Sequence, residues 1–408
     1  MRADTLITGI SQLVTASGPG VKRGRAMREL KIVESATIAV SSGRIVWTGK
    51  ASEWRGDAET KVDAGGRAVV PGLIDPHTHA VWAGDRLNDF EARTSGLTYE
   101  EILAAGGGLR STIRSTAAAS GAELVALARP RIDRLIASGA TTIEIKSGYG
   151  FTPAGELMML EAIRSVSTTV SARIVPTLLV HIPPVRAEDR SNYISQMCDE
   201  LIPKAAQQKL ATAVDVFVEK EAWQIAEAEQ LLECAKRHDL AVKLHSDQFH
   251  SIGGVELGIH FGALSIDHLE ASGPEQIAKI AASSTIATIL PGVSLHLGIP
   301  AAPGRNLIDA GAAVAIGTDL NPGSCPLFST SHALALAVRL NGLTAQEALV
   351  AGTVNAAFAL GLPGAGRLET GCPADFLVLE SNDWRELVYI LGTNPVAEVW
   401  IGGKRIEQ

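Results

Sequence analysis

The chain has 408 residues, of which 46% are hydrophobic and 20% charged, a composition that suits two domains or one large barrel with an appendage. The net charge of −8 argues against nucleic acid as the main partner, because phosphate binding needs a basic surface. No apolar run reaches the roughly 20 residues of a membrane span, and the first residues lack the layout of a signal peptide. The four cysteines show no Cys-x-x-Cys spacing, which favours a reducing cytoplasm over a disulfide framework or a zinc ribbon.

The two ends of the chain have the same sequence pattern, in which short apolar runs alternate with turns. These runs predict strands at 5–10, 36–40 and 44–48, with a hairpin turn at Ser42-Gly43, and further strands at 374–379 and 397–401. Neither end has enough apolar residues for a core of its own. We therefore expect residues 1–68 and 366–408 to form one composite β-sandwich domain.

Residues 69–365 read differently, because strand-like runs alternate with long helical patterns. This alternation is typical of βα units and a parallel sheet. The predicted strands lie at 69–74, 141–145, 173–180, 214–218, 242–244, 264–266, 285–289 and 313–316. The predicted helices lie at 121–138, 154–166, 225–237, 274–282, 306–310, 330–340 and 344–359, the last with Thr344 as its N-cap. Eight such strands in about 250 residues predict an α/β fold in which a (β/α)8 TIM-like barrel is inserted in the β-sandwich domain.

Polar residues cluster where the predicted barrel strands end, which is the face that carries the chemistry in such barrels. His77 and His79 follow the first strand two residues apart, so both imidazoles leave an extended chain on the same side. Half of the ten histidines lie at or just after a predicted strand end, namely His77, His79, His181, His245 and His268. Structural packing offers little reason for this placement, whereas a metal site needs it.

Three imidazoles and one carboxylate make a cage for a borderline metal such as zinc or iron. A metal of this kind lowers the pKa of bound water towards about 7 and makes a nucleophile available at neutral pH. Asp319, after the eighth predicted strand, is placed to hold such a metal and to accept the proton of the water.

The pattern of these residues resembles the amidohydrolase superfamily: His-x-His after strand one, His after strands five and six, and Asp after strand eight. The matching segments are PGLIDPHTHAVWAGDR, TTIEIKSGYG, LKLHSDQF, SIDHLE, AIGTDLNPGSCP and the tail GRLETGCPADFLVL. Within the superfamily they are most similar to the hydrolases of histidine degradation. The resemblance implies a cytoplasmic enzyme that hydrolyses the cyclic amide C–N bond of 4-imidazolone-5-propanoate to N-formimidoyl-L-glutamate.

The resemblance also implies a role for each matching residue. One metal ion per chain, Zn²⁺ or Fe²⁺/Fe³⁺, would be bound by His77, His79, His245 and Asp319. His268 and Asp319 would be catalytic. The implied substrate contacts are Arg86 for the propionate carboxylate, Tyr149 and His181 for the ring, Gln248, where some relatives carry Glu, and Asn321, Gly323 and Ser324 for the glutamate moiety of the product.

From the residues alone, several of these assignments have structural alternatives. Arg86 could form only a surface ion pair with Asp85 or Asp89, Tyr149 could be a core tyrosine, and His181 could simply end a strand. Some superfamily members hold two metals bridged by a carboxylated lysine from strand four. Lys220 lies near that strand end, but it and Glu219 point to opposite sides, so the sequence leaves open which faces inward.

Two other functions compete with this interpretation. A deaminase or hydrolase of another heterocycle, such as a guanine- or hydantoin-like ring, would have no use for Arg86. A metal-containing structural protein would have no use for His268 beside a full ligand set. We expect a small-molecule substrate with a carboxylate, no nucleic-acid or membrane partner, and a homodimer.

Overall fold

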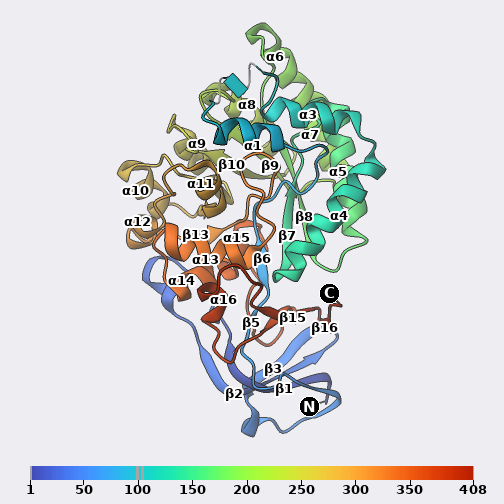
Figure 1. The fold of residues 1–408 in the computed structure, drawn as a ribbon, viewed down its shortest axis with the longest axis vertical. Coiled ribbons are helices and arrows are strands. Elements are labelled where there is room, and N and C mark those ends of the chain that lie inside the picture. Colours follow the sequence, from blue (N-terminus) through green and yellow to red (C-terminus); the bar gives the residue numbers. More distant parts are fainter. Residues whose placement is uncertain (1, 98–100, 103–104, 408) are drawn as a thin grey trace.

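The structure is a computed structural model that describes residues 2–97, 101–102 and 105–407, and it contains two sheets (Figure 1). One sheet joins both ends of the chain and lies below the other in the view of the figure. The second is a parallel barrel surrounded by helices. The predicted fold class is confirmed. That the two parts are separate domains with boundaries at 68/69 and 365/366 stays a prediction.

The terminal sheet is mixed and has the order β16-β15-β14-β5-β1-β2-β3, with β4 beside β1. Its strands are β1 (Arg2–Val14), β2 (Ile32–Ser41), β3 (Arg44–Lys50), β4 (Asp57–Asp63), β5 (Val69–Pro71), β14 (Phe376–Leu379), β15 (Val396–Ile401) and β16 (Lys404–Arg405). The two ends of the chain meet where Phe376 of β14 pairs with Pro71 of β5. The sheet has a core of its own, which includes Ile7, Leu13, Ile38, Val69 and Phe376.

The predicted turn at Ser42-Gly43 is confirmed. Both residues have positive φ, 50° and 73°, and Ser41 pairs with Arg44 across the turn. Left-handed backbone at both central positions matches the twist of the flanking strands, and Gly43 adopts it without steric cost.

The barrel sheet has the order β13-β12-β11-β10-β9-β8-β7-β6, and all of its pairs are parallel. Its strands are β6 (Leu73–Asp75), β7 (Ala140–Lys146), β8 (Arg173–Val180), β9 (Ala213–Val218), β10 (Ala241–Ser246), β11 (Ser265–His268), β12 (Ile286–Ile289) and β13 (Val314–Ile316). Seven of the eight predicted strands correspond to single barrel strands with small shifts at the ends, whereas only the end of the predicted strand 69–74 lies in the barrel.

The barrel closes just beyond the ends of β6 and β13. The N–H of His79 donates to the carbonyl of Leu320 at 2.9 Å, and the N–H of Asp319 donates to the carbonyl of His77 at 3.0 Å. The same segments that carry the candidate metal ligands thus complete the barrel, and this fixes their backbones relative to each other.

The helices cover the outside of the barrel and its rim (Figure 1). They are α1 (Leu87–Thr94), α3 (Leu109–Ala118), α4 (Gly121–Ala137), α5 (Pro153–Ser167), α6 (Ala187–Gln196), α7 (Ile202–Gln207), α8 (Ile225–Arg237), α9 (Gly254–His260), α10 (Pro274–Ala282), α11 (Pro291–Leu297), α12 (Gly304–Asp309), α13 (Thr330–Leu340), α14 (Ala345–Ala351), α15 (Val354–Ala359) and α16 (Glu386–Tyr389). Shorter turns are η1 (Gly24–Arg28), η2 (Ala51–Glu53) and the π-helical turn η3 (Met197–Leu201). No helix in the described ranges is long and apolar enough to cross a bilayer.

Capping explains where several helices begin. Thr344 accepts a hydrogen bond from the N–H of Glu347, and the Glu347 side chain accepts one from the N–H of Thr344, which confirms the predicted N-cap. The predicted helix 344–359 is nevertheless two helices, α14 and α15. Thr353 between them has φ −133° and ψ −91°, outside the helical region.

The predicted strand 69–74 is also two strands, which belong to different sheets. β5 lies in the terminal sheet and β6 in the barrel, with Gly72 between them. A Cβ at Gly72 would lie 2.4 Å from Oγ1 of Thr141, so only glycine fits where the chain passes from one sheet to the other. The terminal sheet therefore extends past residue 68 to Pro71.

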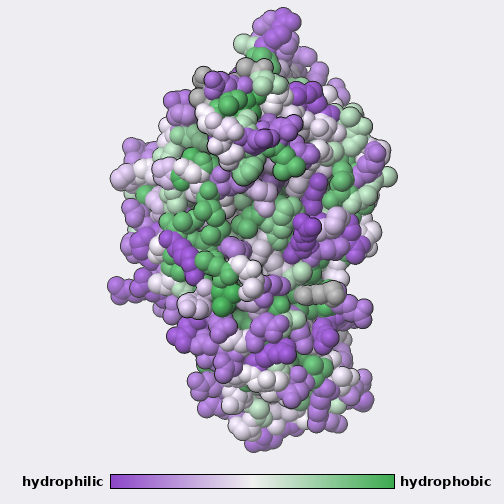
Figure 2. Space-filling view, viewed as in Figure 1, coloured by the Kyte–Doolittle hydropathy of each residue, from purple (hydrophilic) through white to green (hydrophobic). Residues whose placement is uncertain are grey.

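Surface hydropathy differs between the two parts. In the view of Figure 2, hydrophilic residues dominate the lower part formed by the terminal sheet, whereas hydrophobic residues gather on the face of the barrel part. The exposed hydrophobic side chains of the whole molecule include Leu340, at 40% exposure, and Tyr389, at 72%. The predicted helices did not include α1, α3, α6, α7, α9, α11 and α16.

Candidate metal centre and active site

A cavity of about 510 Å³ lies at the carboxyl ends of the barrel strands, where active sites of such barrels are found. Its lining includes every predicted site residue except His77. The lining residues from that set are His79, Arg86, Tyr149, His181, His245, Gln248, His268, Asp319, Asn321, Gly323 and Ser324. His77 is fully buried behind this lining.

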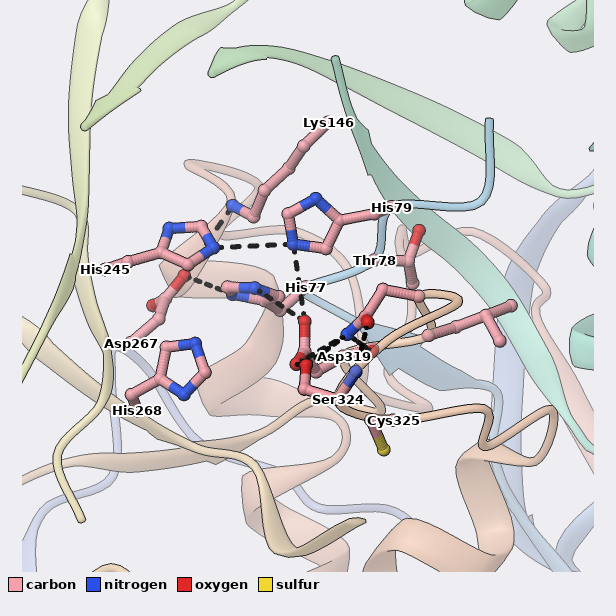
Figure 3. Close-up of polar contacts among 12 residues, drawn as sticks. His77, Thr78, His79, Lys146, His245, Asp267, His268, Asp319, Ser324 and Cys325 are labelled. Atoms are coloured by element: carbon pink, nitrogen blue, oxygen red, sulfur yellow. Dashed lines mark hydrogen bonds and ion pairs between the residues drawn. The ribbon is translucent and has the colours of Figure 1, made fainter. Parts of the chain in front are cut away.

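Four side chains converge at the floor of the cavity (Figure 3). Oδ1 of Asp319 lies 3.3 Å from Nε2 of His77 and 3.3 Å from Nε2 of His79. Nε2 of His245 lies 3.4 Å from Nε2 of His79. Ligand atoms of His77, His79 and His245 lie within 4.8 Å of one another, as do those of His77, His268 and Asp319.

This donor set fits a metal ion. Nε2 of His77 and Oδ1 of Asp319 are buried, and neither atom has a hydrogen-bond partner in the described part of the chain. Buried polar atoms without partners are costly, so two of them aimed at one point need a further explanation. A cation bound by imidazole nitrogens and a carboxylate oxygen supplies that explanation.

Two further carboxylates orient the imidazoles from behind. Nδ1 of His77 lies 2.6 Å from Oδ2 of Asp267, and Nδ1 of His245 lies 3.0 Å from Oδ1 of Asp215. A carboxylate at Nδ1 accepts its proton, which leaves the Nε2 lone pair free for a metal. The geometry thus assigns Nε2 as the ligand atom in both residues.

A network of buried charges supports these carboxylates. Nζ of Lys146 lies 2.8 Å from both Glu144 and Asp215, and Nζ of Lys243 lies 3.5 Å from Oδ2 of Asp267. Lys146, Glu144 and Asp215 are fully buried. Because isolated charges are expensive in the interior, each carboxylate depends on a neighbouring ammonium group.

The charges around the site shift the pKa values of the imidazoles in different directions. Burial lowers the pKa of His79, and it lowers that of His245 well below the usual value. Burial and Lys146 also act to lower the pKa of His77, but Asp267 and Asp319 outweigh them and raise it to about 9. A metal that binds His77 must therefore displace a proton, so metal binding depends on pH.

The loop after β13 shapes Asp319. Its φ is +53°, and Nδ2 of Asn321 donates to Oδ2 of Asp319 at 2.9 Å. Oδ1 of Asn321 accepts from the N–H groups of Gly323 and Ser324, both at 2.8 Å. The two backbone donors hold Asn321 in place, its amide engages Oδ2 of Asp319, and Oδ1 is left to face the imidazoles.

Tyr149 and His181 form the wall of the cavity beside His79. The ring of His181 stacks on His79, with centroids 5.7 Å apart and an interplanar angle of 19°. Burial lowers the pKa of His181 to about 3, so its imidazole is neutral near pH 7. The ring of Tyr149 lies 5.6 Å from that of His181. Tyr149 is buried like a core tyrosine, with 2% exposure, and it also lines the cavity where the substrate contact was expected.

Arg86 lies at the wall of the cavity and pairs with Asp89 through Nε. Asp85 accepts a hydrogen bond from the N–H of Leu87. The predicted ion pair thus exists with Asp89, but it faces the cavity and its side chains are only 12% and 18% exposed. A Cβ at Gly323 would lie 3.0 Å from Nη1 of Arg86, so a glycine there lets the guanidinium approach the loop of Asp319.

After β9, the fourth strand of the barrel, Glu219 faces inward and Lys220 faces outward. Glu219 is buried, and its Oε2 accepts from the N–H groups of Phe249 and His250 at 2.9 and 3.0 Å. Lys220 is exposed and does not line the cavity. The geometry gives no support to a carboxylated Lys220 between two metals.

Some residues of the site were missed by the sequence analysis. Asp215 was overlooked, and Lys146 and Asp267 were placed at strand ends but given no role. Each is a charged residue within an otherwise apolar strand, and that signal could have found them. His296 was expected to be a structural residue without a partner near the site. Its Nε2 lies 2.8 Å from Nη2 of Arg93. Arg93 lies on α1, which begins next to Arg86, whereas His296 of α11 meets Arg93 only through the tertiary fold.

The sequence profile of the Amidohydrolase family matches residues 68–406, and the chain belongs to this family. Relatives at much higher similarity carry one name. The imidazolonepropionase of Deinococcus deserti is 60% identical over 99% of this chain and 100% of its own length. The imidazolonepropionase of Deinococcus radiodurans is 60% identical over the same shares of the two chains.

A solved structure shows the same fold at low identity. It is an adenosine deaminase from Xanthomonas campestris with bound zinc, with a TM-score of 0.74 and 20% identity. The match covers 99% of this chain and 93% of that one. The likeness extends over both the barrel and the terminal sheet.

Proposed function

We propose that this enzyme hydrolyses the cyclic amide C–N bond of 4-imidazolone-5-propanoate and releases N-formimidoyl-L-glutamate, a step of histidine degradation. The observation that carries the proposal is the 60% identity, over the full length, to proteins named imidazolonepropionase. The cavity supports it independently. A candidate metal centre lies at its floor and a guanidinium lies at its wall, which suits a small ring that bears a carboxylate.

The metal centre would hold one ion per chain through His77, His79, His245 and Asp319. We propose Zn²⁺ or Fe²⁺/Fe³⁺, because three imidazoles and one carboxylate suit either ion. When bound, such an ion polarises the ring carbonyl and makes water nucleophilic near neutral pH.

The residues of the cavity position the substrate for this chemistry. Arg86 binds the propionate carboxylate through its planar fork of donors and so fixes the ring above the floor. Tyr149 and the neutral imidazole of His181 contact the ring. Gln248, which is 8% exposed and lines the cavity, contacts the substrate or product.

Proton transfer falls to Asp319 and His268. Asp319 accepts the proton that leaves the attacking water, and His268 orients the water or the developing oxyanion. The ring C–N bond then breaks, and the ring nitrogen takes up a proton as the amidine is formed. Asn321, Gly323 and Ser324 line the space for the glutamate moiety of the product.

The test is to mix the purified protein with freshly prepared imidazolone-propanoate and follow the loss of the ring's ultraviolet absorbance. We expect rapid loss, formation of formiminoglutamate, and about one metal ion per chain by elemental analysis. A chelator should abolish the activity, and added zinc or iron should restore it.

Two outcomes would contradict the proposal. A metal-loaded sample that leaves this substrate intact, but deaminates or opens a ring without a carboxylate, would favour the other heterocycle. A bound metal without any turnover would favour a structural site.

We further propose a homodimer in the cytoplasm. Cys198, Cys234, Cys325 and Cys372 are free thiols, which suits a reducing compartment. Light scattering of the metal-loaded protein measures the oligomeric state, and a monomer mass would contradict the dimer.

A further inference from the structure

We propose that Glu270 positions His268 by accepting its Nδ1 proton, and thereby directs the Nε2 lone pair into the active site. The inference rests on the proposed function, in which His268 orients the attacking water. It adds a residue to the site that does not line the cavity and lies behind the reacting groups.

The first support is a buried carboxylate beside an imidazole. Oε2 of Glu270 lies 3.4 Å from Nδ1 of His268, and both side chains are 3% exposed. Among the described residues, neither carboxylate oxygen of Glu270 has a hydrogen-bond partner of ordinary geometry, and Nδ1 of His268 has none either. A carboxylate buried without partners is costly. The imidazole of His268 is the ionisable group that lies within ion-pair distance of it.

The second support is the backbone between the two residues. His268 and Leu269 both have positive φ, 86° and 72°, in a region that side-chain-bearing residues rarely adopt. The strain is held by the neighbouring strand, because the N–H of Leu269 donates to Ser246 at 3.1 Å and that of Ala271 donates to Asp247 at 2.7 Å. Strained conformations of this kind persist where the surroundings enforce them, often at active sites.

The strained turn has a structural consequence. An extended chain would point residues 268 and 270 along one face of a strand, whereas the turn after β11 brings the carboxylate to Nδ1 of the ring. The ring of His268 lies beside His77 and Asp319 (Figure 3). One ring nitrogen therefore faces Glu270, and the other is left for the reaction.

Three other acidic or amide side chains that line the cavity are less suited to this task. Glu219 is engaged by the 249–250 backbone, and Gln248 is uncharged. Asp319 is committed to the metal centre. Within the described residues, Glu270 is the carboxylate that an ion-pair distance links to His268.

The chemistry follows from the choice of tautomer. With its proton on Nδ1, His268 accepts a hydrogen bond at Nε2 from one hydrogen of the attacking water, while the other proton goes to Asp319. With the opposite tautomer, Nε2 would donate instead, and the water oxygen would turn its lone pair away from the ring carbonyl. Glu270 thus acts on the reaction only through His268.

A double-mutant cycle tests this dependence. We expect Glu270→Gln to lower kcat by about 10- to 100-fold, as for other residues that orient catalytic imidazoles, with KM changed less than twofold. His268→Ala should lower kcat further. In the His268→Ala background, Glu270→Gln should have no additional effect. Losses that multiply in the double variant, or full kcat in Glu270→Gln, would overturn the proposal.

A matched control separates positioning from folding. Glu347 is also a buried carboxylate, but it lies outside the site and pairs with Arg28 and Arg305. Glu347→Gln should lower stability and leave kcat unchanged. A fall in kcat of the same size in both glutamine variants would mean that loss of stability, and not positioning, lowers the rate.

The tautomer of His268 can be measured without any turnover. In zinc-loaded protein labelled with ¹⁵N-histidine, the signal that His268→Ala removes should show the Nδ1-protonated form in the wild type. Glu270→Gln should change that signal, and Glu347→Gln should not. An Nε2-protonated His268 in the wild type would overturn the proposal, even if Glu270→Gln failed to fold. Because this readout needs no substrate, it also stands if the proposed reaction fails.

Discussion

At the scale of single residues, the role proposed for Arg86 is to select substrates that bear a carboxylate. Its guanidinium pairs with Asp89 and is mostly buried, so it is held in place before any ligand arrives. Thr112 also lies near it, with Oγ1 3.5 Å from Nη1. A donor that is already positioned loses little conformational freedom when it binds a carboxylate.

Arg86→Ala should therefore mainly weaken substrate binding. Hydrogen bonds to charged groups contribute about 1.5–3 kcal/mol, which corresponds to a rise in KM of roughly 10- to 100-fold with a small change in kcat. Steady-state kinetics with imidazolone-propanoate measures both constants. Arg129→Ala, which removes an exposed arginine paired with Asp133, is the control. An unchanged KM in Arg86→Ala would contradict the assignment.

At the scale of elements, four strands of the barrel carry the charges beneath the candidate metal centre. Glu144 and Lys146 lie on β7, Asp215 on β9, Lys243 on β10 and Asp267 on β11. Alternating side chains on these strands point into the barrel, and the carboxylates there lie close to His77 and His245. The charged side chains inside the barrel thus orient the imidazole ligands, and the lysines balance the charge of the carboxylates.

Lys146→Met should destabilise the protein by about 3–5 kcal/mol, because it leaves two buried carboxylates without their ammonium partner. Chemical denaturation of the metal-free protein measures the change. The control is Lys279→Met, which removes a partly exposed lysine paired with Glu256 and Glu275 and should change stability much less than Lys146→Met. Equal losses in the two variants would show that the buried network is not balanced in this way.

At the scale of the whole molecule, Glu347 joins the two parts of the structure. Its carboxylate on α14 pairs with Arg28 of η1, which follows β1 of the terminal sheet, at 2.8 Å. It also pairs with Arg305 of α12 on the barrel at 2.8 Å. Burial acts to raise the pKa of Glu347, but Arg305, the Thr344 backbone and Arg28 outweigh it and lower the pKa to about 2.

This depressed pKa predicts how stability depends on pH. A carboxyl group whose pKa is lower in the folded state stabilises the protein above its unfolded pKa, and the contribution disappears as pH falls through the folded value. Glu347→Gln should therefore cost up to about 3 kcal/mol at pH 7, and the difference from wild type should shrink between pH 4.5 and pH 2. Urea unfolding at pH 7 and pH 3 measures it. A difference that is the same at both pH values would contradict the prediction.

Much of the fold could be predicted from the sequence because its signals are local. The strand at Arg173–Val180 and the helices at Pro274–Ala282 and Thr330–Leu340 have the predicted bounds, since apolar periodicity and caps define them without reference to other segments. The split of 69–74 into β5 and β6 was not predictable in the same way. Both strands are apolar, and only their pairing partners assign them to different sheets.

The candidate metal ligands could likewise be predicted from the sequence. Their residue types are restricted by metal chemistry, and their positions at strand ends are readable from the pattern that alternates strands and helices. By itself the sequence determined the parallel barrel and the convergence of His77, His79, His245 and Asp319. The carboxylate site at Arg86 was implied only by the resemblance to the family, and it stays a proposal.

Only the tertiary structure decided the contacts that depend on side-chain direction. It turned Glu219 inward to the backbone and Lys220 outward, and it brought Asp267 to His77 and Glu270 to His268. These contacts could not be predicted because the residues lie far apart along the chain or depend on a strained backbone. Asp267 lies 190 residues from His77, and the positive φ of His268 follows from hydrogen bonds to a neighbouring strand rather than from any local preference.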